Sequence, residues 1–291
     1  MENHTNKIYQ ERMNQTATSK FGVIQPHLKI GIKLLDFGSG FSPEFIEQVK
    51  NAGADYVAYD VSPTVQDKLK ENNVKFLTKE QLLQVESEFD IIYLSSVFHE
   101  LMSYLTRQER TEVFAMIDKT LKSDGKIIIR DWGYSEKRYS EEQIIIHSWD
   151  YATRKKYSLQ LTTNEVEEEV HSWVTELVKN SVIRKPWLFL GIDGKPVSPN
   201  IYIPTSSHDI YEIMFHVVWG LDSIEREAKE TYTVTPELIE KWICDPLGYH
   251  IEEVSKEVDD TYLPYLQKYF KMDEIPWPTK IIYVLKKASD K

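Results

Sequence analysis

Cysteine is almost absent from this sequence of 291 residues, with Cys244 as its single representative. One cysteine forms no disulfide within the chain and provides no cysteine zinc cluster. The eight histidines are scattered, without the i, i+4 pairing of many zinc sites. We therefore expect no metal centre.

Long apolar runs are missing as well. No stretch approaches the roughly 20 apolar residues that a membrane-spanning helix needs. The polar residues 1–16 contain no apolar signal core. Because 41% of the residues are hydrophobic, the chain can nevertheless bury a core. The sequence predicts a cytoplasmic protein that does not cross a membrane.

Positive charge is in deficit. The chain has 35 Lys and Arg against 46 Asp and Glu, which gives a net charge of −11. Neutralising phosphates supplies much of the affinity of nucleic-acid-binding proteins, so these usually carry a basic surface. The charge therefore argues against a nucleic-acid partner and favours a small or uncharged substrate.

Apolar runs of strand length alternate with helical stretches over about the first 130 residues. This alternation is typical of βαβ units, whose strands form a parallel sheet covered by helices. The sequence predicts a doubly wound, mostly parallel α/β sheet. The expected strands are residues 32–36, 56–60, 74–77, 89–94 and 126–131.

Four helix starts are recognisable between these strands. Ser42 and Ser62 are typical N-cap residues, each followed by proline in the first helical turn. Thr78 and Thr106 each begin a capping box, with Gln or Glu three residues later. These signals fix where the connecting helices are expected to begin.

The alternation stops after residue 131 for about a hundred residues. Apolar spacing on one face predicts helices over 164–179 and 208–230 in this interruption. A strand-like run stands at 144–146. We interpret the interruption as an insertion that could cover the active site.

The alternation resumes near residue 235 with a helix that runs through Trp242. Strands are expected at 249–258 and 280–287. We predict a helical N-terminal extension over residues 1–24 and a core made of residues 25–134 and 235–291. Residues 135–234 are predicted to form a lid that is inserted after strand five and sets substrate specificity.

A glycine-rich turn directly follows the first predicted strand: Asp36, Phe37, Gly38, Ser39 and Gly40. Ligands of open parallel sheets bind at the carboxyl ends of the strands, and glycine there lets the backbone approach the ligand closely. Asp60 ends the second predicted strand about twenty residues later, where a carboxylate can accept both hydroxyls of a ribose. The turn and Asp60 together predict a site for a nucleoside-containing ligand.

Two other readings of the turn stay open at this point. A nicotinamide-binding G-x-G-x-x-G loop would have its third glycine where Pro43 stands. Asp36 would also repel a pyrophosphate, whereas it suits a cationic amino acid. A plain strand-to-helix turn without a ligand is the second alternative.

Four segments in order carry a family resemblance. They are residues 34–40, Tyr59 with Asp60, residues 89–101 and residues 121–131. Together they resemble the motifs of class I S-adenosylmethionine-dependent methyltransferases, over roughly residues 25–134. The resemblance implies a Rossmann-like methyltransferase fold with S-adenosylmethionine as cofactor.

The resemblance also implies contacts of single residues with the cofactor. Gly38, Ser39 and Gly40 would hold the methionine part of the cofactor. Asp36 would lie near the amino group of that part, and Asp60 would hold the ribose. Thr78 and Lys79 would contact the adenine. Ser95 and Ser96 would contact the cofactor from the end of strand four.

His99, Glu100 and Asp131 follow strands four and five, so we expect them to border the transferred methyl group. A general base is needed only when the acceptor must lose a proton. His99 is the candidate base, Asp131 the candidate carboxylate that orients the acceptor, and Glu100 a candidate substrate contact. A histidine that packs under the helix is the alternative for His99.

In the insertion, His216 and Trp219 are candidate substrate contacts, since Gly220 interrupts the predicted helix beside them. Most of the surrounding aromatic residues are expected to fill a core. We expect an S-adenosylmethionine-dependent methyltransferase whose small-molecule acceptor lies between core and lid. An RNA or protein methyltransferase of the same fold is one alternative. A non-catalytic S-adenosylmethionine-binding subunit is the other, and the oligomeric state stays open.

Overall fold

The structure is a computed structural model, and it describes residues 16–133, 159–160, 166–184, 201–202, 207–275 and 277–288. It divides into two compact units. The core unit comprises residues 1–132, 236–256 and 281–291, and the inserted unit comprises residues 133–235 and 257–280. None of the helices in the described residues is long and apolar enough to cross a membrane.

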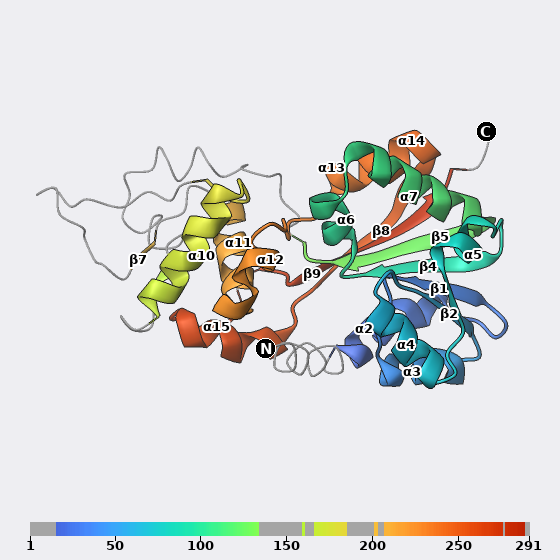
Figure 1. Cartoon of the computed structure of the whole chain (residues 1–291), viewed down its shortest axis with the longest axis horizontal. Helices are drawn as coiled ribbons and strands as arrows, with labels where there is room; N and C mark the ends of the chain where they lie inside the picture. Colours follow the sequence, from blue (N-terminus) through green and yellow to red (C-terminus); the bar gives the residue numbers. More distant parts are fainter. Residues whose placement is uncertain are drawn as a thin grey trace, which may run out of the picture. The chain divides into compact units, whose positions relative to one another are not determined.

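A seven-stranded sheet forms the centre of the core unit (Figure 1). Its strand order is β3-β2-β1-β4-β5-β9-β8, so the order reverses between β1 and β4. The first five strands pair in parallel, and β9 runs antiparallel to β5. The predicted doubly wound, mostly parallel sheet is confirmed. The strands are β1 (Lys33–Phe37), β2 (Asp55–Tyr59), β3 (Phe76–Leu77), β4 (Phe89–Ser95), β5 (Leu121–Asp131), β8 (Tyr249–Glu257) and β9 (Lys280–Lys287).

Helices cover both faces of this sheet (Figure 1). One face carries α2 (Ala17–Ile24), α3 (Pro43–Asn51) and α4 (Pro63–Glu71). The other carries α6 (Phe98–Tyr104), α7 (Arg107–Thr120), α13 (Pro236–Ile239) and α14 (Asp245–Leu247), and a π-helical turn, Glu240–Cys244, joins the last two. The short helix α5 (Lys79–Leu83) follows β3.

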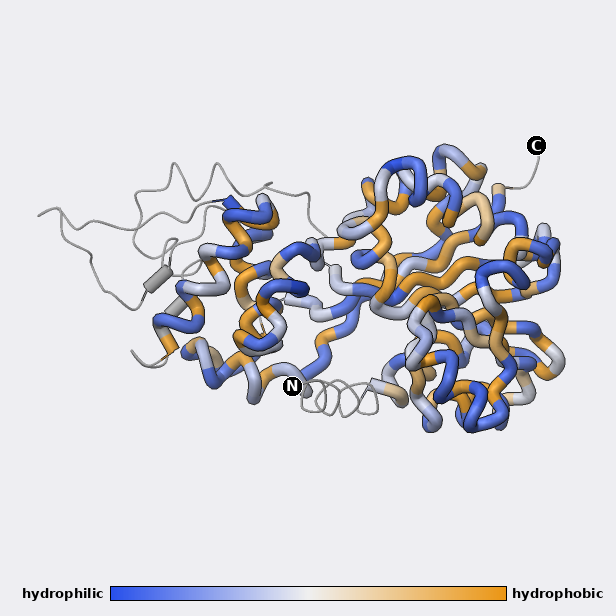
Figure 2. Tube along the Cα trace, viewed as in Figure 1, coloured by the Kyte–Doolittle hydropathy of each residue, from blue (hydrophilic) through white to orange (hydrophobic). Residues whose placement is uncertain are grey.

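The core beneath α2 and α3 follows from the alternation of side chains along each strand. Leu34, Ile91 and Ile128, from β1, β4 and β5, are buried in one cluster with Phe45 of α3 and Ile24 of α2. Every second residue of a strand faces the same side, so the intervening apolar residues face the opposite helices. Figure 2 shows the resulting hydrophobic band along the strands. Burying each such side chain contributes about 1.5–3 kcal/mol.

The expected helix starts are confirmed in position. In both capping boxes, the threonine hydroxyl accepts the backbone N–H three residues later, and that residue's side chain accepts the threonine N–H. Ser42 and Ser62 have the extended N-cap backbone and a proline after them, but their side chains make no capping hydrogen bond. Ser42 and Ser62 are therefore confirmed as the N-cap positions, while proline in the first turn supplies a helical φ.

Two domain boundaries differ from the sequence interpretation. Residues 1–24 were expected to be an extension outside the core, yet Ala17 and Ile24 of α2 are fully buried in the core cluster. Residues 257–280 were expected in the core, yet they group with the inserted unit. The aromatic residues of this second segment pack with the insertion: the rings of Phe215 and Tyr262 lie 6.0 Å apart in a T-shaped contact.

The inserted unit is mainly helical in its described part. The predicted helix over 164–179 is observed as α10 (Glu167–Lys179). The helix expected over 208–230 is shorter: α11 (Ser207–Val217) stops before Gly220, whose φ is +74°. The remaining elements are η2 (Leu221–Ser223), α12 (Ile224–Glu227), η4 (Asp260–Tyr262), α15 (Leu263–Tyr269) and a two-stranded sheet of β6 (Leu159–Gln160) and β7 (Ile201–Tyr202). The strand-like run at 144–146 lies outside the described residues.

Candidate active site

The structure brings the predicted cofactor residues of the core unit to one edge of the sheet. β1 to β5 are parallel, so their carboxyl ends lie at the same edge. The predicted residues stand at or just after these ends: the loop after β1, Asp60 after β2, Thr78 and Lys79 after β3, and Ser95 and Ser96 at the end of β4. In this fold class the edge beside the reversal of strand order is where ligands bind.

The glycine turn after β1 has a backbone that glycine alone adopts readily. Gly38 and Gly40 have φ values of +71° and +55°. The N–H groups of Gly38 and Ser39 both donate to the carbonyl of Tyr59, at 2.8 and 3.1 Å. A Cβ on Gly38 would lie 2.5 Å from Cγ2 of Val97, in the loop after β4. The turn is therefore pressed against β2 on one side and against the β4 loop on the other.

Asp60 ties the glycine turn to the loop after β2. Its Oδ2 accepts the N–H of Gly40 at 2.9 Å, and its Oδ1 accepts the N–H of Ser62 at 2.8 Å. Each carboxylate oxygen has two lone pairs, so both remain able to accept a further hydroxyl donor. The carboxylate is thereby oriented at the strand ends, where the family resemblance implies the ribose.

Asp36 is a buried carboxylate at the end of β1. It is 3% exposed, and its Oδ2 accepts the hydroxyl of Tyr56 at 2.7 Å. Burial raises the pKa of Asp36 to about 6, while the Tyr56 hydrogen bond and the charge of Lys20 act in the opposite direction. Tyr56 and Lys20 were not among the predicted site residues.

The end of β4 contributes two serines with different environments. The buried hydroxyl of Ser95 has no hydrogen-bond partner among the described residues. Ser96 has a φ of +58°, unusual for a residue with a side chain, and its N–H donates to the carbonyl of Arg130 at 2.8 Å. Such strain is commonly found at functional sites.

These observations agree with an S-adenosylmethionine site. The turn at Gly38 leaves backbone rather than side chain at the edge, the Asp60 carboxylate is fixed there, and the Ser95 hydroxyl lacks a partner among the described residues. A nucleoside with an amino-acid tail needs these three features: close backbone approach, a carboxylate for hydroxyls and further polar groups. The residues present therefore fit the cofactor.

His99 and Asp131 form a buried pair, although they are 32 positions apart. Nδ1 of His99 lies 2.6 Å from Oδ1 of Asp131, and the backbone N–H of His99 donates to Oδ2 at 3.0 Å. The N–H of Trp132 also donates to Oδ1, at 2.7 Å. His99 is 4% exposed and Asp131 is fully buried. Both oxygens of Asp131 are therefore engaged by its own chain, and the acceptor contact expected from the sequence stays a prediction.

The other candidate substrate residues differ from one another in exposure. Glu100 is exposed in the first turn of α6. Trp219 is partly buried just before Gly220, and its backbone N–H donates to the carbonyl of His216 at 3.1 Å. His216 is fully buried in the inserted unit.

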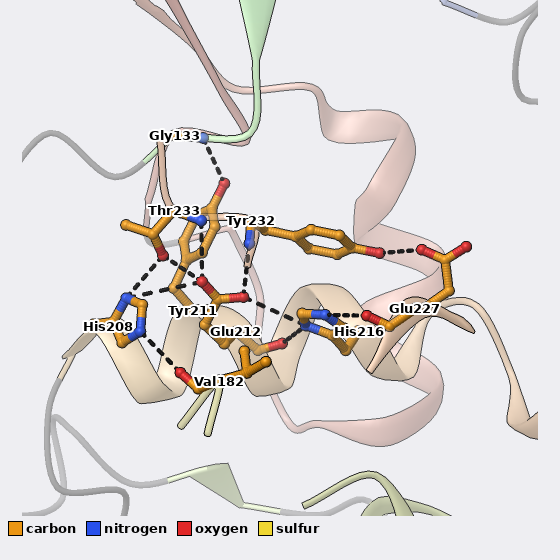
Figure 3. A network of polar contacts seen from close by, with 9 residues as sticks. All are labelled: Gly133, Val182, His208, Tyr211, Glu212, His216, Glu227, Tyr232 and Thr233. Atoms are coloured by element: carbon orange, nitrogen blue, oxygen red, sulfur yellow. Dashed lines mark hydrogen bonds and ion pairs between the residues drawn. The ribbon is translucent and has the colours of Figure 1, made fainter. Parts of the chain in front are cut away.

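A polar network explains the burial of His216 (Figure 3). Its ring nitrogens lie 2.6 and 3.0 Å from the backbone carbonyls of Glu212 and Glu227, and its ring stacks on Tyr232 at 4.0 Å. The Glu212 carboxylate accepts the N–H groups of Tyr232 and Thr233, both at 3.0 Å. Both ring nitrogens of His216 are thus engaged within the inserted unit, and the substrate contact expected for it stays a prediction.

Comparison with known proteins now separates the possibilities left open by the sequence. Residues 9–174, more than half of the chain, match a family model described as a methyltransferase domain. The chain belongs to this methyltransferase family. It is an S-adenosylmethionine-dependent methyltransferase of the class I fold, as the resemblance implied. The nicotinamide-binding and ligand-free readings of the glycine turn are thereby set aside.

Solved structures with a similar fold share little sequence with this methyltransferase. They include a methyltransferase from Archaeoglobus fulgidus (12% identity, 97% of this chain and 99% of that chain, TM-score 0.49) and one from Mesorhizobium loti (12%, 92% and 97%, 0.48). Another is the 1,6-didemethyltoxoflavin-N1-methyltransferase of Burkholderia thailandensis, solved with 1,6-didemethyltoxoflavin and S-adenosylhomocysteine (12%, 95% and 80%, 0.45). No curated protein matches the sequence.

Sequence reasoning missed three polar residues beside the site, Lys20, Tyr56 and Arg130. Lys20 is buried on α2 between Ala17 and Ile24, at the spacing of one helix face. A lysine on an otherwise apolar face was the signal that could have identified it. Tyr56 and Arg130 gave no such signal, because their partners depend on strand register.

Replacing Gly38 by alanine tests the close approach of the turn to Val97. We expect Gly38→Ala to lower the free energy of unfolding by about 2–4 kcal/mol, because the side chain is strained at positive φ and meets Val97. Denaturant unfolding measures this change. Gly22→Ala is the matched control, since a Cβ there meets nothing within 4 Å and lies in a helix. Equal stability of the Gly38→Ala variant and wild type would contradict the tight fit.

Proposed function

We propose that this methyltransferase acts on a small molecule whose accepting atom gives up a proton to His99. The observation that carries the proposal is the buried His99–Asp131 pair at the ends of β4 and β5. The net charge of −11 supports a small acceptor over RNA. S-adenosylmethionine supplies a methyl group on a sulfonium, which an acceptor lone pair attacks in line.

The geometry around His99 suits a general base. A carboxylate accepts hydrogen bonds, so Nδ1 of His99 carries the proton shared with Asp131, and Nε2 is the nitrogen that takes a proton. Asp131 holds the ring through Nδ1 and through the His99 backbone, and its charge stabilises the imidazolium that forms. We therefore assign Asp131 the role of positioning His99.

The remaining roles follow from the places of the residues in the fold. We infer that Gly38, Ser39 and Gly40 receive the amino-acid part of the methyl donor, and that Asp60 binds its ribose. Thr78 and Lys79, after β3, stand where the adenine is expected. The inserted unit lies outside the family's cofactor motifs, and we infer that it selects the acceptor.

Labelled methyl donor tests the class of acceptor. Wild-type protein is incubated with S-adenosylmethionine that carries a labelled methyl group and with cell extract separated into small molecules, RNA and protein. We expect label in the small-molecule fraction. Label confined to RNA or protein would contradict the small-molecule proposal.

Variants of the pair test the proton transfer. With an acceptor from that fraction, we expect His99→Gln to lower kcat by about 100-fold or more, since a general base contributes roughly that much. Asp131→Asn should lower kcat by about 10- to 100-fold, because an oriented partner of a functional histidine is lost. In both variants the decline of kcat toward acid pH should disappear or shift.

His250→Gln serves as the control, because His250 is an exposed histidine on β8. It should leave kcat and the pH profile unchanged. Binding of S-adenosylhomocysteine by each variant, measured by calorimetry, shows that the cofactor site is intact. Wild-type kcat and an unchanged pH profile in His99→Gln would rule out His99 as the base.

A further inference from the structure

Lys20 is a buried lysine on α2, the helix that contacts Tyr93 of β4 and Arg130 of β5. Its side chain belongs to a residue only 6% exposed, between the fully buried Ala17 and Ile24 of α2. Lysine is rarely buried to this extent unless its charge has a function or a partner, because desolvating an ammonium costs free energy. Burial lowers the pKa of Lys20 to about 8, so the side chain is still mostly charged at neutral pH.

Hydrogen bonds and strand register place Lys20 above the cofactor edge. The hydroxyl of Tyr93, on β4, donates to the backbone carbonyl of Lys20 at 3.3 Å. Tyr93 pairs in register with Asp36, the first residue of the glycine turn. The charges of Lys20 and Asp36 interact, since each changes the pKa of the other. Lys20 therefore lies beside the turn that receives the amino-acid part of the methyl donor.

Two more polar side chains lie on the same face of the sheet. Leu34, Tyr93 and Ile128 are buried in the cluster beneath α2. Asp36, Ser95 and Arg130 stand two positions after them on the same strands, so their side chains leave the sheet on that face.

Ser95 and Arg130 pair in register at the ends of β4 and β5. Arg130 is fully buried, and one of its guanidinium nitrogens donates to the hydroxyl of Ser19 on α2 at 2.7 Å. The buried Ser95 hydroxyl has no partner in the described part of the chain. An ammonium, a guanidinium and a hydroxyl thus converge where β1, β4 and β5 end, and all three can donate to an anion.

We propose that Lys20 binds the carboxylate of the amino-acid part of S-adenosylmethionine, with Ser95 and Arg130 as neighbouring donors. Asp36 faces the ammonium of the same amino acid, so the two ends of the zwitterion meet opposite charges. This assignment rests on the proposed cofactor site at residues 36–40. It explains why a charged residue occupies the buried face of α2.

The methyl donor without its carboxylate is the probe for this contact. Calorimetry compares S-adenosylmethionine with its decarboxylated analogue, which keeps the adenosine, the sulfonium and the amine. Wild-type protein should bind S-adenosylmethionine about 10- to 100-fold more tightly, as expected for a hydrogen-bonded ion pair that is lost. This comparison needs no variant, so it does not depend on the folding of a mutant. Equal affinities would overturn the proposal.

Lys20→Met removes the charge and keeps an unbranched side chain that is only one heavy atom shorter. It should lower the affinity for S-adenosylmethionine by about 10- to 100-fold and leave the affinity for the decarboxylated analogue nearly unchanged. Lys33→Met is the matched control, since Lys33 begins β1 at the opposite end and pairs with Glu88. That control should bind both ligands as wild type does.

The outcomes separate this assignment from the proposed function. An equal loss for both ligands in Lys20→Met would show that Lys20 only neutralises Asp36, and it would overturn the carboxylate contact. Wild-type affinity in Lys20→Met for both ligands would overturn it as well, and the cofactor site would stand. Failure of the wild-type protein to bind either ligand would overturn both.

Discussion

The close packing around Gly38 is the constraint on which the arrangement of the loops at the carboxyl edge of the sheet depends. The residue has a left-handed backbone, and the place of its missing side chain is occupied by Val97. This fit allows Gly38 and Ser39 to donate to the carbonyl of Tyr59, which in turn brings Gly40 to the carboxylate of Asp60. One close contact between the β1 and β4 loops therefore aligns the groups that we propose meet the methyl donor.

Among the described residues of the core unit, buried charge is concentrated at the same end of the sheet. Asp36 and Lys20 lie on one face, and His99 and Asp131 form their pair beside the end of β5. Groups of this kind cost free energy to bury, so their accumulation at one edge points to function rather than to stability. The polar network around Glu212 in the inserted unit is different, because its hydrogen bonds connect α11 with residues 232–233 of the same unit.

Local signals in the sequence predicted much of the fold. The apolar runs gave the parallel strands within a residue or two at most ends, and the two threonine capping boxes begin helices with both expected hydrogen bonds. The candidate site was predictable where it depends on a short segment, as in the turn at Gly38. Local signals of this kind do not report contacts between residues that are far apart in the sequence. The contact of His99 with Asp131 and the burial of Lys20 next to Tyr93 therefore could not be predicted without the strand register. For the same reason the grouping of residues 257–280 with the insertion was missed.

Binding of S-adenosylhomocysteine to Asp60→Ala tests the central claim most directly, because Asp60 joins the glycine turn to the expected ribose. Calorimetry should show one binding site in the wild-type protein and an affinity lower by about 100-fold in Asp60→Ala, since hydrogen bonds from two hydroxyls to a carboxylate are lost. Asp67→Ala, on the exposed side of α4, should bind as wild type does. Wild-type affinity in Asp60→Ala, or no binding by the wild-type protein, would contradict the account.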